Sequence, residues 1–132
     1  MDSSAKKKIL VVDDEADFLK MMKLRLEDQY DVLTASSGKA ALALIDSGHP
    51  DVVLLDLVME GMDGLEVLKT IRKTDKDLPV FMLTAFSDLD RMNQANKLKS
   101  SGFIVKTDNI EKQLRCIHSA LGLSNKYRKY MK

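Results

Sequence analysis

The sequence contains one cysteine, Cys116, so an internal disulfide bond is excluded and a reducing compartment is favoured. Long hydrophobic runs are also missing, because no apolar stretch approaches the ~20 residues that a membrane-spanning helix needs. The charged segment at residues 1–8 is not followed by an apolar stretch of signal-peptide length. These absences argue against secretion and membrane insertion, so we expect a cytoplasmic protein without membrane partners.

The 132 residues suffice for one domain with one hydrophobic core. The formal net charge of +1 conceals an uneven distribution, because many basic residues lie near the two ends. They are Lys6, Lys7, Lys8, Lys126, Arg128, Lys129 and Lys132. We therefore predict an acidic domain over residues 1–123, with a core at about 7–121, and a basic tail or start of a linker at 124–132. A solvated terminus explains such charges more simply than nucleic-acid binding.

Short apolar runs alternate with stretches whose apolar residues recur every three or four positions, as on one face of a helix. The predicted strands are Ile9–Val12, Asp31–Ala35, Val52–Leu55, Val80–Leu83 and Phe103–Val105. The weakest helical pattern lies at Asp88–Ser100, where asparagine and glutamine dilute the apolar face. Five strand–helix repeats predict an α/β fold with a parallel sheet covered by helices on both faces.

Polar side chains follow four of the predicted strands. Asp13 and Asp14 follow the first, Asp56 the third, Thr84 the fourth and Lys106 the fifth. Ligands of open α/β sheets bind outside the carboxyl ends of the strands, so we expect these side chains to meet at one edge. Clustered carboxylates raise one another's pKa unless a cation is present, and Mg²⁺ or Mn²⁺ suits such oxygen ligands. One carboxylate could then accept a phosphoryl group whose oxygens Lys106 and Thr84 bind.

Each of these residues also has a simpler interpretation. The acidic segment 13–15 could cap a helix, and Asp56 could be a turn residue at a strand end. Thr84 could cap the helix that begins near Asp88, and Lys106 could be an ordinary surface lysine. A functional site is favoured because all of these residues fall at the same edge of the predicted sheet.

Four stretches carry a resemblance to a known family: ILVVDDEADF, VVLLDLVMEGMDGLEVL, LPVFMLTAF and GFIVK. From about Lys7 to Leu121 the chain resembles the receiver domains of bacterial response regulators. The resemblance implies a flavodoxin-like, doubly wound (βα)5 fold with strand order 2-1-3-4-5. It also implies two-component phosphorelay signalling, in which a sensor histidine kinase or phosphotransfer protein phosphorylates Asp56. An output protein or domain would contact the fourth helix, fifth strand and fifth helix.

The resemblance further implies a metal site made by Asp13, Asp14, Asp56 and the backbone carbonyl of Val58. Asp14 would ligate the metal directly and Asp13 largely through water. Thr84 and Phe103 would form a switch: Thr84 follows the phosphoryl group inward, and Phe103 changes rotamer. Phe103 has no hydroxyl group, so its part of the switch must work by packing alone.

The chain departs from the family pattern near the expected site. Glu60 and Thr107 stand where the family usually has proline, and the proline after Lys106 often follows a cis peptide bond. A cis bond before Thr107 would cost about 2.5–4 kcal/mol, which puts the reach of Lys106 in question. The resemblance also implies that Val58 and Phe86 flank the path of the water that hydrolyses the phosphorylated aspartate. Neither side chain can hydrogen-bond that water, so the sequence predicts a long-lived phosphorylated state.

These patterns favour a signalling phosphoacceptor whose phosphorylation and dephosphorylation are self-catalysed, and not an enzyme with a separate substrate. A phosphatase or mutase using an aspartyl phosphate would normally carry two aspartates one residue apart, unlike the adjacent Asp13-Asp14. A nucleotide or flavin binder would need a phosphate loop after the first strand, and no GxGxxG occurs there. A receiver-like interaction module without phosphorylation remains an alternative, since Glu60 and Thr107 depart from the family pattern.

Overall fold

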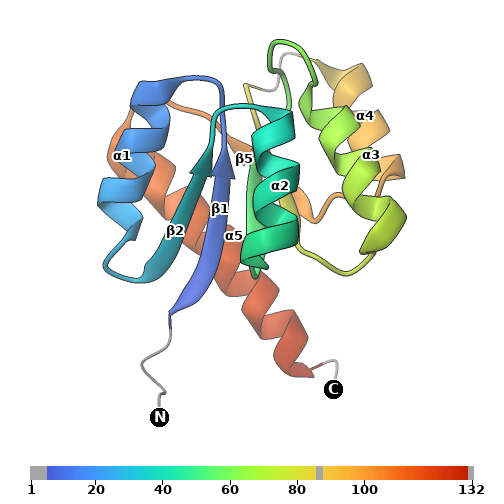
Figure 1. The fold of residues 1–132 in the computed structure, drawn as a ribbon. Helices are drawn as coiled ribbons and strands as arrows, with labels where there is room; N and C mark the ends of the chain where they lie inside the picture. The colour runs from blue at the N-terminus through green and yellow to red at the C-terminus, as the bar shows by residue number, and fades with distance from the viewer. Residues whose placement is uncertain (1–5, 86–87, 131–132) are drawn as a thin grey trace.

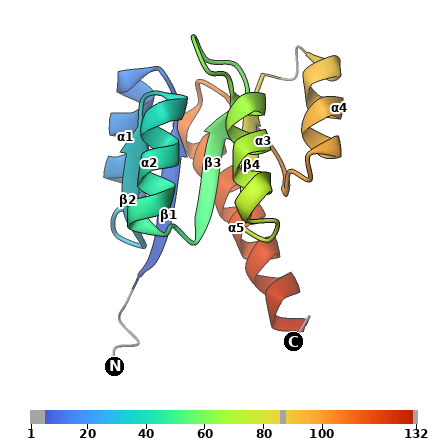
Figure 2. The same cartoon turned by 45° about the vertical axis from the view of Figure 1, so that its right-hand side comes forward.

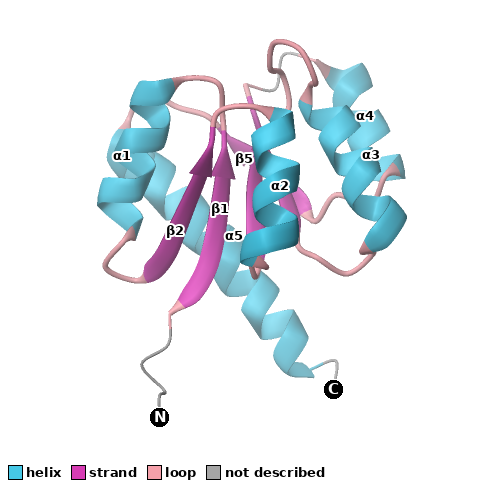
Figure 3. Cartoon of the chain, in the orientation of Figure 1, coloured by secondary structure: helices cyan, strands magenta, loops and turns pink. Residues whose placement is uncertain are grey.

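The computed structural model describes residues 6–85 and 88–130, with side chains described as far as residue 122. Its strands are β1 Lys7–Val12, β2 Tyr30–Ala35, β3 Val52–Asp56, β4 Val80–Thr84 and β5 Gly102–Val105. Its helices are α1 Ala16–Leu26, α2 Gly38–Gly48, α3 Gly64–Thr74, α4 Leu89–Lys97 and α5 Ile110–Tyr130. Strands and helices alternate, and the strands form one parallel sheet in the order β2-β1-β3-β4-β5 (Figures 1 and 3). This confirms the predicted flavodoxin-like fold.

Hydrophobic side chains fill both faces of the sheet, as the continuous apolar strands predicted. Alternate residues of one strand point to opposite faces, so Leu10 and Val12 join one cluster while Ile9 and Val11 join the other. The first cluster packs beneath α2, α3 and α4, and the second beneath α1 and α5. Figure 2 shows the resulting three layers.

Short polar side chains fix where three helices begin. Ser37, Asp63 and Asp88 occupy the N-cap positions of α2, α3 and α4. Each accepts a hydrogen bond from the backbone N–H three residues later, which satisfies a donor that the helix itself leaves free. The weakly patterned segment before β5 thus forms a helix, although Ala95 is its one buried residue between Leu89 and Lys97.

The strand register aligns the carboxyl ends of the central strands. Val12 of β1 pairs with Leu55 of β3, so the next residues of the two strand segments, Asp13 and Asp56, lie side by side. Asp56 in turn pairs with Leu83, the neighbour of Thr84 on β4. The side chains that the sequence suggested for a site therefore lie at one edge of the sheet.

The last helix is longer than predicted. Residues 124–130 were expected to follow it, but α5 runs from Ile110 to Tyr130. Its C-terminal part extends beyond the amino ends of the strands, away from the edge that carries the aspartates (Figure 1). Whether this basic segment acts as a tail or a linker stays a prediction. None of the helices in the described residues is long and apolar enough to cross a membrane.

Candidate functional site

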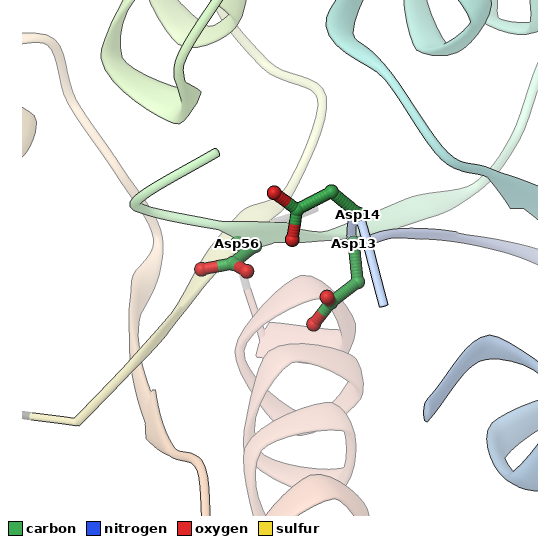
Figure 4. A group of neighbouring side chains, drawn as sticks. All are labelled: Asp13, Asp14 and Asp56. Carbon is green, nitrogen blue, oxygen red and sulfur yellow. The ribbon is translucent and has the colours of Figure 1, made fainter. Parts of the chain in front are cut away.

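Three aspartates converge at the carboxyl edge of the sheet, as the sequence predicted. Asp13 and Asp14 follow β1, Asp56 ends β3, and the three side chains approach one another in Figure 4. Each offers one carboxylate oxygen, and these oxygens lie within 4.8 Å of one another. Two chain segments that are far apart in sequence thus build one acidic cluster.

The three carboxylates differ in exposure and in hydrogen bonding. Asp13 is fully buried, Asp56 is 7% exposed and Asp14 is exposed. Backbone N–H groups hold one oxygen of each: Glu15 N–H donates to Asp13 Oδ1 at 2.9 Å, Val58 N–H to Asp56 Oδ1 at 3.1 Å, and Glu60 N–H to Asp14 Oδ2 at 3.3 Å. The β1–α1 loop therefore orients Asp13, and the β3–α3 loop orients both Asp56 and Asp14.

Lys106 reaches the acidic cluster from the end of β5. Its Nζ lies 2.7 Å from Asp13 Oδ2, 2.8 Å from Glu15 Oε1 and 3.5 Å from Asp56 Oδ2. Partial burial lowers the pKa of Lys106, but its contacts with the carboxylates of Asp13 and Glu15 outweigh this, so that the pKa lies above its ordinary value. Lys106 is 21% exposed in its side chain and ion-paired, so the interpretation as an ordinary surface lysine is wrong.

Asp56 is harder to ionise than an ordinary aspartate. Burial, followed by the charge of Asp13, raises its pKa from 3.8 to about 6. The charge of Lys106 and the Val58 N–H act in the opposite direction but do not cancel the increase. Without further positive charge, the cluster disfavours the ionised form of Asp56.

The donor set fits a hard divalent cation. Among the described residues, the buried Asp13 Oδ2 forms an ion pair with Lys106 Nζ at 2.7 Å and has no further hydrogen-bond partner. A buried carboxylate oxygen next to two further carboxylates is what Mg²⁺ or Mn²⁺ binds, and the metal would compete with Lys106 for this oxygen. A cation there would also offset the repulsion from Asp13, which adds to the effect of burial on the Asp56 pKa.

Helix capping does not explain the acidic segment or Thr84. Glu15 stands at the N-cap position of α1, yet its side chain makes no capping hydrogen bond. The helix after β4 is capped by Asp88 and not by Thr84. Thr84 is buried at 5% exposure, and its backbone carbonyl accepts a hydrogen bond of 2.8 Å from the Lys106 N–H. Thr84 and Lys106 therefore end neighbouring strands beside Asp56.

The remaining predicted residues are placed in part. Val58 lies on the β3–α3 loop with its side chain 56% exposed, and the metal-binding role of its carbonyl stays a prediction. Phe86 lies outside the described residues. Phe103 is half-buried on β5 and packs against the core cluster beneath α2, α3 and α4, and its role as a packing switch stays a prediction.

Comparison with known proteins decides the family. The sequence model of the response regulator receiver domain matches residues 9–117. The chain belongs to the response regulator receiver domain family. Receiver domains are parts of two-component systems, interact with kinases and output domains, and as a family bind divalent metal.

The receiver domain is similar to both single-domain and longer proteins. The solved structure of the chemotaxis protein CheY4 of Vibrio cholerae is 31% identical, with a TM-score of 0.79 over 88% of this chain and 99% of that chain. A CheY-like receiver domain protein from Methanospirillum hungatei JF-1 is 27% identical, with a TM-score of 0.82 over 93% and 99% of the two chains. The probable transcriptional regulator ycf27 of Guillardia theta is 39% identical over 96% of this chain. That match covers 50% of the relative, so the chain spans about half the length of the curated relatives of this kind.

Both positions where this receiver domain departs from the family's prolines use the N–H group that proline lacks. The Glu60 N–H donates to Asp14, and the Thr107 N–H donates to Gln113 Oε1 at 2.9 Å. No cis peptide bond occurs among the described residues, and Lys106 reaches the carboxylates without one. The doubt that the sequence raised about the reach of Lys106 is thereby resolved.

Sequence reasoning missed two residues of the site. Glu15 was interpreted as a helix-cap acid but pairs with Lys106, and Gln113 was not considered. A signal for Gln113 existed, since it interrupts the apolar face of α5 between Ile110 and Ile117 and is fully buried there. A polar residue at a core position needs hydrogen-bond partners, which is a reason to search for them.

Proposed function

We propose that this receiver domain accepts a phosphoryl group on Asp56 from a phosphohistidine of a sensor kinase or phosphotransfer protein. The observation that carries the proposal is the position of the Asp56 carboxylate: beside Asp13 and Asp14, with Lys106 Nζ 3.5 Å away. Phosphoryl transfer to an aspartate needs an accepting carboxylate, a positive group and acidic metal ligands close together, and all of these lie at one edge of the sheet.

In the proposed step an oxygen of the Asp56 carboxylate attacks phosphorus. The phosphorus–nitrogen bond of the donor breaks, the imidazole keeps the electron pair and regains a proton, and an acyl phosphate forms on Asp56. Lys106, already beside Asp56, offsets negative charge on the transferred oxygens. Thr84, at the end of the adjacent strand, binds one of these oxygens and follows it inward.

A bound Mg²⁺ or Mn²⁺ would supply positive charge to the phosphoryl oxygens. Asp13, Asp14 and Asp56 would hold it, with the Val58 carbonyl as a further ligand. Exposed Asp14 points at the cluster and has no ion pair with a lysine among the residues that the structure describes, so we expect Asp14→Ala to weaken metal binding more than Asp13→Ala. Titration of both variants with Mg²⁺, followed by NMR, checks this order; the reverse order contradicts the ligand assignment.

The proposed output is a change in a surface formed by α4, β5 and α5, which a partner protein or domain recognises. Phe103 on β5 packs against the core cluster that includes Ala95 of α4, so a rotamer change there could reach that surface through the cluster. Similarity to transcriptional regulators of about twice this length supports gene control as the output, through a partner or further domain and not through nucleic-acid binding by this domain. The cytoplasm is the compartment that this role implies. The domain acts as a self-catalysed phosphoacceptor and not as an enzyme on other substrates.

Intact-mass measurement tests the proposal. We expect Mg²⁺ and acetyl phosphate to add one phosphate to the wild type and none to Asp56→Asn. Asp51→Asn changes an exposed aspartate at the opposite end of β3 and should be phosphorylated like the wild type. An unchanged wild-type mass, or equal labelling of Asp56→Asn, would refute the proposal and favour a receiver-like module that works without phosphate.

A further inference from the structure

Gln113 is a buried polar residue to which the proposed function gives no role. The buried polar or charged residues of the described part of the chain are Asp13, Asp56, Thr84 and Gln113. The first three belong to the phosphoacceptor site. Gln113 lies on the first turns of α5, where it is fully buried in line with core residues such as Ile117.

The side-chain amide of Gln113 binds both neighbours of Lys106 in sequence. Gln113 Oε1 accepts a hydrogen bond of 2.9 Å from the Thr107 N–H, and Gln113 Nε2 donates one of 2.9 Å to the Val105 carbonyl. Both ends of the amide are thus satisfied by the backbone on either side of one residue. An apolar side chain of the same size could fill the space but could make neither bond.

These two hydrogen bonds fix the backbone position from which the Lys106 side chain extends. The Lys106 N–H is itself bound to the Thr84 carbonyl at 2.8 Å, so the backbone around Lys106 is held on the strand side and on the helix side. Further along the loop, Asn109 N–H donates to Thr107 Oγ1, and Asn109 Oδ1 accepts from the Lys112 N–H at the start of α5. The loop is therefore anchored to α5 by side chains at both of its ends.

A fixed backbone at Lys106 matters because the lysine side chain is long and flexible. Nζ must stand near Asp13 and Asp56 at the end of four rotatable bonds, and a displaced backbone would displace it. Misplacing a charged group by about 1 Å commonly costs on the order of 100-fold in rate. The geometry of the loop therefore bears directly on how well Lys106 can offset charge on a phosphoryl group.

We propose that Gln113 is a positioning residue that holds Lys106 in place for phosphoryl transfer to Asp56. This inference rests on the proposed function. The side-chain hydrogen bonds of Gln113 go to the backbone of Val105 and Thr107, and Gln113 acts on Lys106 through them. A purely structural role in the core is the competing explanation, and the two differ in whether the effect of Gln113 depends on Lys106.

The test compares initial rates of phosphorylation by acetyl phosphate and Mg²⁺. Gln113→Met keeps the volume but removes both hydrogen bonds, and we expect its rate to fall about tenfold or more. Mg²⁺ affinity should not weaken, because the three aspartates stay in place. Gln94→Met makes the same chemical change on an exposed face of α4 and should keep the wild-type rate.

A double-mutant cycle separates positioning from a structural role. If Gln113 acts through Lys106, adding Gln113→Met to Lys106→Ala lowers the rate no further. An unchanged rate in Gln113→Met, or an equal loss in both backgrounds, overturns the inference while leaving phosphorylation of the wild type intact. A wild type that takes no phosphate overturns the proposed function and this inference together.

A measurement on the wild type covers the case in which Gln113→Met does not fold. The Thr107 amide proton should exchange slowly with solvent, because it is bound to a fully buried acceptor. The Asp108 amide of the same loop provides the comparison. Exchange of the Thr107 amide as fast as that of an unprotected loop amide would show that the Gln113 bond does not hold the loop, and would overturn the inference.

Discussion

The loops after β3 and β5 both reach Asp56, but they are held in different ways. Residues 57–63 donate the Val58 N–H to Asp56 and the Glu60 N–H to the exposed Asp14. Residues 106–109 bring Lys106 to the cluster and are bound to the buried Gln113. Residues 57–63 thus contribute backbone dipoles from a loop that is buried at Leu57 and Met59 and exposed at Val58 and Glu60. Residues 106–109 contribute a full charge, and their backbone is hydrogen-bonded to a core side chain.

The difference predicts where the site can adjust. The β3–α3 loop is anchored at its far end, where Asp63 pairs with Arg91 of α4 at 2.6 Å and where Gly64 passes close to β3. A Cβ on Gly64 would lie 2.2 Å from the Asp56 carbonyl oxygen, so only glycine allows this approach. Between these anchors Glu60 and Gly61 are exposed, so we expect this part of the loop to adjust to a ligand, whereas the β5–α5 loop keeps Lys106 in place. Substitutions in the two loops should therefore have effects of different size.

The largest effect is expected from removing the charge that the β5–α5 loop supplies. Lys106→Ala should lower the rate of phosphorylation by acetyl phosphate about 100-fold, since a preorganised positive group is lost. Mg²⁺ affinity should not weaken, because Lys106 competes with the metal for Asp13. Lys112→Ala removes an exposed lysine of α5 and should have the wild-type rate. Equal rates for both variants would contradict the role given to Lys106.

A second prediction concerns the charge of Asp56, which both loops stabilise incompletely. In metal-free buffer at pH 7, Asp56→Asn should increase the free energy of unfolding by about 2 kcal/mol, because the buried charge is unfavourable. The folded-state pKa of about 6 lies above the unfolded value, so the stability penalty is absent below about pH 4 and complete above about pH 6. Urea unfolding of both proteins at pH 4 and pH 7 measures this; a gain that does not increase with pH contradicts the pKa assigned to Asp56.

A third prediction concerns Val58 on the β3–α3 loop. Its exposed apolar side chain offers no hydrogen bond to an attacking water, so we expect the acyl phosphate to persist for minutes or longer. Val58→Asn should shorten this lifetime by about tenfold, because an amide can position the water. Following phosphoprotein decay after removal of acetyl phosphate measures it. Val58→Leu is the apolar control, and a lifetime in Val58→Asn as long as in Val58→Leu would refute the effect.

The smallest effect is expected at Glu60, whose backbone N–H forms an exposed hydrogen bond to Asp14. Glu60→Pro removes the N–H that binds Asp14 and should weaken Mg²⁺ affinity by about threefold. Glu60→Gln keeps the N–H and should bind Mg²⁺ more tightly than Glu60→Pro. If the two variants bind Mg²⁺ equally, the backbone contact does not orient Asp14.

The convergence of Asp13, Asp14, Asp56 and Lys106 could be predicted from the sequence. In a parallel sheet the carboxyl ends of the strands share one edge, so residues that follow different strands must lie near one another there. The strand order itself came from the resemblance, since the alternation of strands and helices alone allows several orders.

The hydrogen bonds of Gln113 and the pairing of Glu15 with Lys106 could not be predicted in the same way. Both depend on side-chain directions at the end of a loop, which periodicity does not encode. The length of α5 was also missed, because its apolar stripe stops near Leu121 while the helix continues to Tyr130. Hydrophobic periodicity reports packing against the sheet, and α5 extends past the sheet (Figure 1).

Chemical mapping of the phosphorylated residue tests the central claim most directly. Borohydride reduces an acyl phosphate on aspartate to homoserine, which tandem mass spectrometry locates in the sequence. After treatment with acetyl phosphate and Mg²⁺, we predict homoserine at position 56 and unmodified aspartate at Asp13 and Asp14. Homoserine at either of those two positions, or at none of the three, would contradict the assignment of Asp56 as the phosphoacceptor.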